Sequence, residues 1–398
     1  MKKLSFIILI VSLFFLFGCT IDFQNNPSGN DNQPKPIEPT DDPTEPTDDP
    51  TTEEPKEPVK TDNKLLVAYY YGGYQIPTKE ALEVLDVINT CFASISKRTN
   101  DEGKLEYYLN VSGISGLQYF KNLHQYGLKV CISIGGWHDD ASYWNTYSEA
   151  ASTEEYRKMV AESCLAILEQ YDLDGIDMDW EYPKAGDKDN FTLLMKEISD
   201  TLKAKRSDYL ITAAVPSGSW SNTRYDYNRL GNILDYLYVM TYDLDLDGGS
   251  KTRHLADIKT MKYACQNLIT CGVASSKIIP GAAFYGRIYK VSSSTNHGLG
   301  QAYDSSLTKT VHYEYIKYYY LDNLGAGISK YYDASSEAYY LYAEEKGEFI
   351  TFDSEESVQT KWEIGSTSYG GLMFWCYQDD VSRSLIKALH EERFKNNE

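Results

Sequence analysis

The chain of 398 residues is long enough for two average domains or for one large barrel with additions. It has 38 basic and 58 acidic residues, which gives a formal net charge of −20. This acidic balance argues against nucleic acids and anionic polymers as partners and favours a neutral polymer.

The first 19 residues predict an export signal. Two lysines precede an apolar run over 4–17, which is shorter than the roughly 20 residues that span a bilayer. The sequence LFGC at 16–19 resembles the bacterial lipobox, in which the cysteine becomes the lipidated N-terminus of the mature protein. We therefore expect lipidation of Cys19 and an exported lipoprotein at the cell surface or outer membrane of a bacterium. The alternatives are a plain secretory signal and an uncleaved anchor.

Residues 20–63 predict a disordered linker. Segment 22–63 holds twelve acids and three bases with almost no large apolar side chains, and EPTDDPT occurs at both 38–44 and 45–51. Such a segment buries too little apolar surface to offset its conformational entropy. Proline and the repulsion of like charges favour an extended tether.

From residue 64 onward, short apolar runs alternate with longer amphipathic segments. Two of the amphipathic segments, 154–171 and 191–204, repeat their apolar residues at helical spacing. Eight runs have the length and composition of buried strands: 65–71, 87–94, 129–135, 173–181, 209–216, 234–243, 277–286 and 370–377. Eight strands with helical crossovers predict an α/β fold, a (β/α)8 TIM barrel over 64–393.

One connection interrupts this rhythm. More than 80 residues separate the seventh and eighth runs, and they are dense in tyrosine and contain strand-like pieces. A segment of this length is too long for a plain loop. We expect a small α+β insertion at 288–352, on the catalytic face of the barrel.

The run DGIDMDWE at 174–181 is the strongest chemical signal. Asp177, Asp179 and Glu181 share one parity, and the apolar residues between them share the other. Because a strand alternates its faces and helices cover the outside of a barrel, the three acids should point inward. Grouped buried carboxylates are unfavourable unless they share protons or hydrogen bonds, so this row predicts catalysis.

Glu181 comes last on this strand, at the end where barrel enzymes carry their active sites. Like charges and apolar surroundings should raise its pKa and keep it protonated as a general acid. Asp179 lies roughly 7 Å back along the strand, at about 3.3 Å per residue. The residues alone do not identify the partner carboxylate that a glycosidase usually places across the bond it breaks.

The region 64–393 resembles glycoside hydrolase family 18, the chitinase family. Its DxxDxDxE signature is matched by Asp174, Asp177, Asp179 and Glu181, followed by Tyr182 and a proline. The resemblance implies that the substrate's 2-acetamido carbonyl replaces the second carboxylate and forms an oxazolinium intermediate. It further implies that Asp177 and Asp179 share a proton, that Asp179 holds the acetamido N–H, and that Glu181 protonates the leaving oxygen and then activates water.

Further motifs of the family follow in order along the chain. The resemblance implies that Ser133 supports Asp177, that Asp174 supports the signature strand, and that Tyr242 binds the acetamido carbonyl. Trp375 should form the floor under the distorted sugar. The remaining substrate-binding residues that it implies are Tyr69, Phe92, Gly136, Trp137, Tyr182, Met240, Asp243, Tyr285 and Arg287. The family often has a tryptophan shortly after its MTYD motif, which stands here at 240–243, whereas LDLDGGSK follows in this chain. Trp137, just after the glycine pair at 135–136, is a candidate aromatic platform.

The implied activity is retaining hydrolysis of β-1,4 bonds in chitin or chitooligosaccharides, by an endo-acting chitinase. An endo-β-N-acetylglucosaminidase acting on N-glycans and a peptidoglycan hydrolase would use the same acids. A sugar-binding lectin without activity would normally lack the acid, which is present as Glu181. The cysteines form no metal-binding pattern, and Cys265 and Cys271 are close enough to pair without any requirement to do so. We expect a monomer without metal or cofactor.

Overall fold

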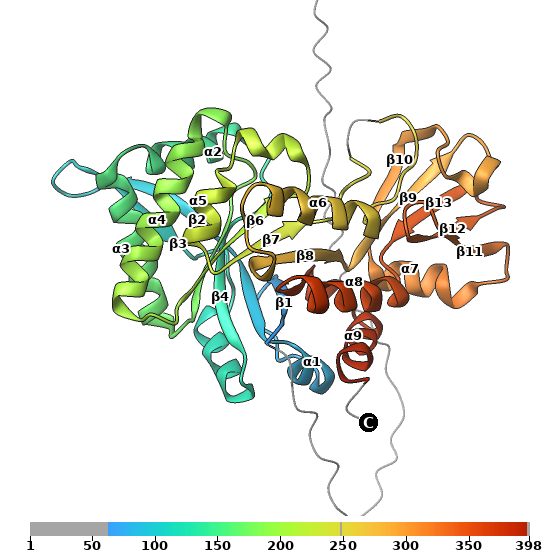
Figure 1. The fold of residues 1–398 in the computed structure, drawn as a ribbon, viewed down its shortest axis with the longest axis horizontal. Helices are drawn as coiled ribbons and strands as arrows, with labels where there is room; N and C mark the ends of the chain where they lie inside the picture. The colour runs from blue at the N-terminus through green and yellow to red at the C-terminus, as the bar shows by residue number, and fades with distance from the viewer. Residues whose placement is uncertain (1–62, 247–248, 396–398) are drawn as a thin grey trace, which may run out of the picture. The chain divides into compact units, whose positions relative to one another are not determined.

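The computed structural model describes residues 63–246 and 249–395 (Figure 1). The expectations for the signal segment 1–19, for lipidation of Cys19 and for the linker 20–63 lie outside these residues. Among the residues described, no helix has the length and hydropathy needed to cross a membrane.

Eight parallel strands close into a barrel, because β1 pairs with both β2 and β14. Each barrel strand corresponds to one of the eight predicted runs, so the predicted (β/α)8 fold is confirmed. In barrel order the strands are β1 (Leu65–Tyr71), β2 (Val87–Thr99), β4 (Lys129–Gly135), β5 (Gly175–Asp179), β6 (Leu210–Pro216), β7 (Tyr236–Met240), β8 (Ile278–Ala283) and β14 (Gly371–Trp375).

Helices cover the outside of the barrel strands (Figure 1). The helix α3 begins and ends where periodicity predicts, with Thr153 accepting a hydrogen bond from the N–H of Tyr156 as its N-cap. The helices are α1 (Lys79–Val84), α2 (Ala141–Ser152), α3 (Glu154–Tyr171), α4 (Lys188–Lys205), α5 (Tyr227–Ile233), α6 (Ile258–Thr270), α7 (Tyr313–Tyr319), α8 (Glu355–Ser368) and α9 (Ser384–Phe394).

Strand β2 is longer than its apolar run, and its last residues pair antiparallel with β3 (Leu105–Asn110). This hairpin was not expected from the sequence. Its buried residues are Ile95, Tyr107 and Leu109, which join the main hydrophobic core beneath the helices. Only two of the six residues of β3 are buried, so the segment LEYYLN lacks the continuous buried apolar run that marks the barrel strands.

The expected insertion between the seventh and eighth barrel strands is a second, five-stranded antiparallel sheet with helix α7 (Figure 1). Tyr289, Tyr340 and Phe349 form a separate aromatic core within it. The strand order is β10 (Tyr303–His312), β9 (Tyr285–Val291), β13 (Glu348–Phe352), β12 (Ala338–Ala343) and β11 (Ile328–Asp333). Since β9 begins two residues after β8 ends, this sheet starts directly at the carboxyl end of the barrel.

A buried ion pair fixes the return of the chain from the insertion to the barrel. Lys361 on α8 and Asp353 after β13 are both fully buried, with Nζ 2.7 Å from Oδ2. The same carboxylate oxygen accepts the backbone N–H of Ala283 at 2.8 Å, and Oδ1 accepts the hydroxyl of Ser357 at 2.7 Å. Asp353 therefore ties the end of β8 to the end of the second sheet.

Candidate active site

The carboxylate strand β5 alternates its faces as the sequence indicates. Ile176, Met178 and Trp180 lie in the core beneath the helices. Asp177 is fully buried and Asp179 is 4% exposed, on the opposite parity. The row of acids therefore rises along the barrel interior toward the carboxyl ends of the strands.

Asp177 is the deepest acid and is held by three hydroxyl groups. Its Oδ2 accepts hydrogen bonds from Tyr69 at 2.9 Å and Ser133 at 2.7 Å. Its Oδ1 accepts one from Thr212 at 2.8 Å. Burial raises the pKa of Asp177, and these three donors oppose the rise because they favour the carboxylate. The geometry provides a fixed acceptor below Asp179.

Asp179 stands between two other carboxyl groups. Burial and the charges of Glu181 and Asp177 raise its pKa well above the ordinary value. Among the described residues, no partner lies within hydrogen-bond distance of its buried Oδ1. A buried oxygen without a partner is unfavourable, so a protonated Asp179 that can turn toward a new partner suits this position.

Glu181 follows the strand and reaches the cleft. Burial raises its pKa to about 7, a hydrogen bond with the Tyr182 side chain opposes the rise, and the charge of Asp243 adds to it. An acid with this pKa is substantially protonated near neutral pH and can both donate and accept a proton. The predicted general acid thus has suitable electrostatics.

Two glycines let strand β4 approach the catalytic strand. Gly135 has φ +122°, and a Cβ built on it would lie 2.0 Å from the carbonyl oxygen of Asp179. The N–H of Gly136 donates to that same oxygen at 2.9 Å. These two glycines therefore hold the backbone of Asp179, and the close approach at position 135 is one that only glycine permits.

Above the acids opens a cleft of about 1490 Å³. It is lined by Asp179, Glu181 and most of the side chains expected to contact substrate, namely Phe92, Trp137, Tyr182, Met240, Tyr242, Asp243, Tyr285, Arg287 and Trp375. Tyr69 and Gly136 lie below this surface, Tyr69 as a hydrogen-bond donor to Asp177 and Gly136 as a donor to Asp179. Tyr71 and Trp220 also line the cleft and were not expected from the sequence.

Aromatic rings surround Trp375 at one side of the cleft. Phe92 stacks on Trp375 with ring centroids 5.5 Å apart and planes at 14°. The rings of Tyr69 and Tyr71 lie 5.7 Å and 5.9 Å from that of Trp375. Trp137 is more open, with 67% of its surface exposed. Rings held in this way give this side of the cleft a flat apolar surface.

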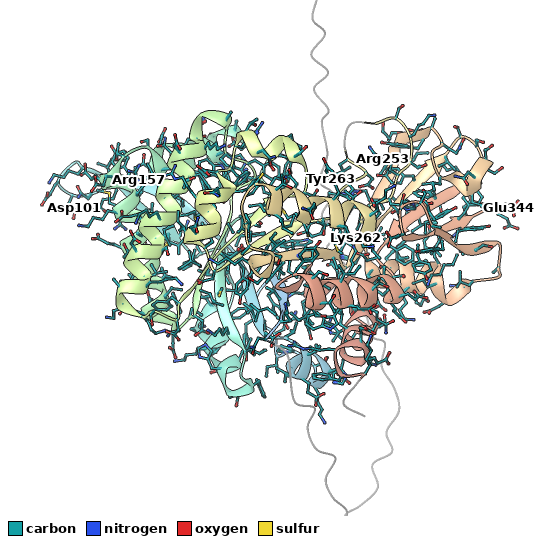
Figure 2. The ribbon with its side chains drawn as sticks, viewed as in Figure 1. Asp101, Arg157, Arg253, Lys262, Tyr263 and Glu344 are labelled. Carbon is teal, nitrogen blue, oxygen red and sulfur yellow. The ribbon has the colours of Figure 1, made fainter. Side chains whose placement is uncertain are left out.

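The second sheet contributes to the other side of the cleft. The hydroxyl of Tyr285 and Nη2 of Arg287 both donate to Oδ1 of Asp243, each at 2.6 Å. Nη1 of Arg287 donates to Asp245 at 2.5 Å. A further ion pair joins helix α6 to the second sheet. Lys262 of α6 lies beside that sheet (Figure 2), and its Nζ is 2.7 Å from Oε2 of Glu337. The insertion is therefore part of the site and is joined to it by charged contacts.

Asp174, the first acid of the signature, lies before β5, at the opposite end from Glu181. Its Oδ2 accepts the backbone N–H of Val130 at 2.8 Å and lies 2.8 Å from Nε2 of His124. Its Oδ1 accepts from Arg206 at 2.9 Å. These contacts of Asp174 lie at the amino end of the barrel, away from the cleft.

Comparison with known proteins agrees with this geometry. The sequence profile of Glycosyl hydrolases family 18 matches residues 66–380. The chain belongs to this family. As a member of family 18 it is a glycosidase, as the carboxylate strand predicts.

Among its relatives, Chitinase 1 of Aphanocladium album is 30% identical over 305 residues, which cover 71% of this chain and 69% of that protein. Chitinase A1 of Niallia circulans is 29% identical over 298 residues, which cover 66% of this chain but only 42% of the relative. Among solved structures, a family 18 N-acetylglucosaminidase from Paenibacillus barengoltzii superposes with a TM-score of 0.71 at 26% identity. That match covers 83% of this chain and all of the other.

Within this family 18 site, sequence reasoning missed Thr212 and Asp245. Thr212 is a polar residue in the otherwise apolar run LITAAVP, which is a signal that could have identified it. Asp245 gives no comparable signal, because its partner Arg287 lies 42 residues away. Cys265 and Cys271, which are close enough in sequence to pair, are free thiols.

Proposed function

We propose that this family 18 enzyme is an endo-acting chitinase that hydrolyses β-1,4 bonds between N-acetylglucosamine units with retention, by substrate-assisted catalysis. The observation that supports it most is the row of Asp177, Asp179 and Glu181, in which the two aspartates are buried and Glu181, with its pKa raised to about 7, lines an aromatic-lined cleft. The relatives named as chitinases support the same substrate class.

In the first step, protonated Glu181 gives its proton to the glycosidic oxygen while the bond from the anomeric carbon to that oxygen breaks. The carbonyl oxygen of the substrate's own 2-acetamido group attacks the anomeric carbon from the opposite face and forms an oxazolinium ion. Asp179 passes its proton toward Asp177 and turns its free oxygen to the acetamido N–H. The negative charge thus meets the positive charge that develops on the substrate.

In the second step, Glu181 is a carboxylate and takes a proton from water. The water oxygen attacks the anomeric carbon from the face that the leaving sugar vacated, and the acetamido group is restored. Two inversions at one carbon give net retention. The two reaction steps together need one acid–base residue and one helper residue that stabilises the acetamido group.

The walls of the cleft fit a distorted sugar above these acids. Tyr242 lines the cleft, and burial together with the nearby carboxylates raises its pKa well above the ordinary value, so its hydroxyl stays protonated and can donate to the acetamido carbonyl. Trp375 provides the floor, and Asp243 provides a carboxylate for a sugar hydroxyl.

The test is a comparison of substrates with the protein over residues 63–398. Chitooligosaccharides should be cleaved, and their fully de-N-acetylated counterparts should not be, because they lack the nucleophile. An N-linked glycoprotein and purified peptidoglycan serve as competing substrates. If either of these is cleaved while chitooligosaccharides are left intact, the polymer assignment is wrong; if no 2-acetamido substrate is cleaved by folded protein, the mechanism is wrong.

We also propose that the enzyme is exported and held at a bacterial membrane by lipid on Cys19. Support comes from the sequence LFGC and the acidic, proline-rich segment after it. Growth with a clickable fatty acid should label the full-length chain and leave Cys19→Ala unlabelled. Equal labelling of both forms, or of neither, would contradict the proposal.

A further inference from the structure

We infer that Asp245 is a positioning residue for the reaction: together with Tyr289 it fixes Arg287 so that Arg287 holds Asp243 at the cleft. This inference rests on the proposed function, because it concerns how the same site grips its sugar. Asp245 is not one of the residues that the family motifs indicate.

Five side chains form one continuous ladder of hydrogen bonds. Oδ1 of Asp243 accepts from the hydroxyl of Tyr285 and from Nη2 of Arg287, each at 2.6 Å. Oδ1 of Asp245 accepts from Nη1 of Arg287 at 2.5 Å, and its Oδ2 accepts from the hydroxyl of Tyr289 at 2.6 Å. Each carboxylate thus accepts one hydrogen bond from the guanidinium of Arg287 and one from a tyrosine hydroxyl.

The fold brings together two segments whose ladder residues are each spaced two positions apart. Tyr285, Arg287 and Tyr289 alternate along β9, so they share one face of the second sheet. Asp243 and Asp245 have the same spacing in the segment after β7, where Asp243 has φ +59°. The two sets interleave, and every carboxylate faces a donor from β9. The arrangement joins the insertion to the loop that carries Asp243.

Burial distinguishes the two carboxylates. The side chain of Asp245 is 1% exposed and that of Arg287 is 7% exposed, whereas 43% of the Asp243 side chain is exposed. Asp243 and Arg287 line the cleft. Both donors bind Oδ1 of Asp243, and no donor among residues 63–246 and 249–395 binds its Oδ2, which is thus open to a sugar hydroxyl. Asp245 is buried beneath the cleft surface, where its negative charge and its hydrogen bond orient Arg287.

The single guanidinium is shared between two carboxylates. A planar guanidinium donates hydrogen bonds in fixed directions. The bond from Nη1 to Asp245 therefore sets the plane in which Nη2 donates to Asp243. Without Asp245, Arg287 keeps its bond to Asp243 but loses the contact that defines its orientation. Asp243 should then hold the sugar less well. Removal of Asp245 should therefore lower activity only when Asp243 is present to be positioned.

The experiment is a double-mutant cycle on chitooligosaccharide hydrolysis with Asp243→Asn, Asp245→Asn and the double variant. Each single variant weakens a hydrogen bond to a charged group and should therefore lose about 10- to 100-fold in kcat/KM. The double variant should be no worse than Asp243→Asn within about threefold. Asp245→Asn should also divide its loss between kcat and KM as Asp243→Asn does.

The matched control is Asp235→Asn. Asp235 accepts the backbone N–H of Ile211 at 2.8 Å and pairs with Lys203 at 2.7 Å, before β7 and therefore at the other end of the barrel from the cleft. It undergoes the same chemical change in an ion pair and should keep wild-type kcat and KM in the folded protein. Tyr289→Phe removes one bond to Asp245 and should give a smaller loss with the same division, which keeps the test possible if Asp245→Asn does not fold.

Three results would overturn the inference. Losses that multiply in the double variant would show that Asp245 acts independently of Asp243. Wild-type kinetics in Asp245→Asn or Tyr289→Phe would show that the ladder has no effect on the site. Failure of the wild-type enzyme to cleave any 2-acetamido oligosaccharide would remove the proposed function, and this inference with it.

Discussion

Replacing Glu181 with glutamine removes the ionisable group and keeps the size and shape of the side chain. Burial raises the pKa of Glu181 from 4.5 to about 7. At about 1.36 kcal/mol for each pKa unit, the ionised form destabilises the fold by about 3 kcal/mol. This penalty is absent below pH 4.5, where the group is protonated in both the folded and unfolded states. It grows as the pH rises and is complete above pH 7.

The stability of the two proteins should therefore differ in a pH-dependent way. At pH 8.5, Glu181→Gln should have a free energy of unfolding up to about 3 kcal/mol higher than that of the wild type, and the difference should shrink toward zero near pH 4. Urea denaturation at both pH values measures it. The exposed Glu391 provides the matched control, and Glu391→Gln should change stability little at either pH.

Activity should change in the opposite direction. Glu181→Gln should lower kcat by at least about 10²- to 10⁴-fold, because a general acid contributes that much and the same group acts in both steps. The wild-type rate should fall as the pH rises through about 7, where the acid loses its proton. A stability difference that is equal at both pH values, or a normal rate in the glutamine variant, would refute the reasoning.

Three further predictions follow from other contacts. Asp179→Asn should lower kcat at least about 100-fold while binding of chitooligosaccharide persists in calorimetry; normal turnover would contradict its role as helper. Lys361→Met leaves the charge of Asp353 buried without its lysine partner. It should lower the free energy of unfolding measured in urea by about 3–5 kcal/mol, and a loss below about 1 kcal/mol would contradict a stabilising role of the pair. Gly135→Ala places a Cβ against the carbonyl oxygen of Asp179 and should reduce kcat more than tenfold. Gly186→Ala is the control, because Gly186 is exposed and a Cβ there meets no atom, and it should keep the wild-type kcat. Equal kcat values for the two variants would show that the close contact at Gly135 is not needed.

The barrel could be predicted in some detail because its signals are local. A parallel strand buried on both faces is a continuous apolar run, so 129–135 was placed at its full length as β4. Helix α3 was placed at both ends because its apolar residues keep a helical period from 154 to 171. Strand β3 was missed because its pairing depends on the extension of β2 and its own residues are half exposed.

The site could be predicted where one strand or one motif holds the chemistry. The alternation of Asp177, Asp179 and Glu181 is visible in eight consecutive residues. The supports of these acids come from other strands, so the hydroxyl of Thr212 beneath Asp177 and the carboxylate of Asp245 behind Arg287 needed the folded chain. Long-range pairing carries no periodic signal, and charge alone does not tell a buried partner from a solvated side chain.

The measurement that tests the central claim most directly is the anomeric form of the first product. Proton NMR of chitopentaose during the first minutes of hydrolysis by the wild-type protein resolves the α and β forms at the new reducing end before they interconvert. Catalysis through the substrate's acetamido group predicts β product first, with α appearing later by mutarotation. Initial formation of α product would mean that water attacks directly, and would contradict the mechanism assigned to Asp179 and Glu181.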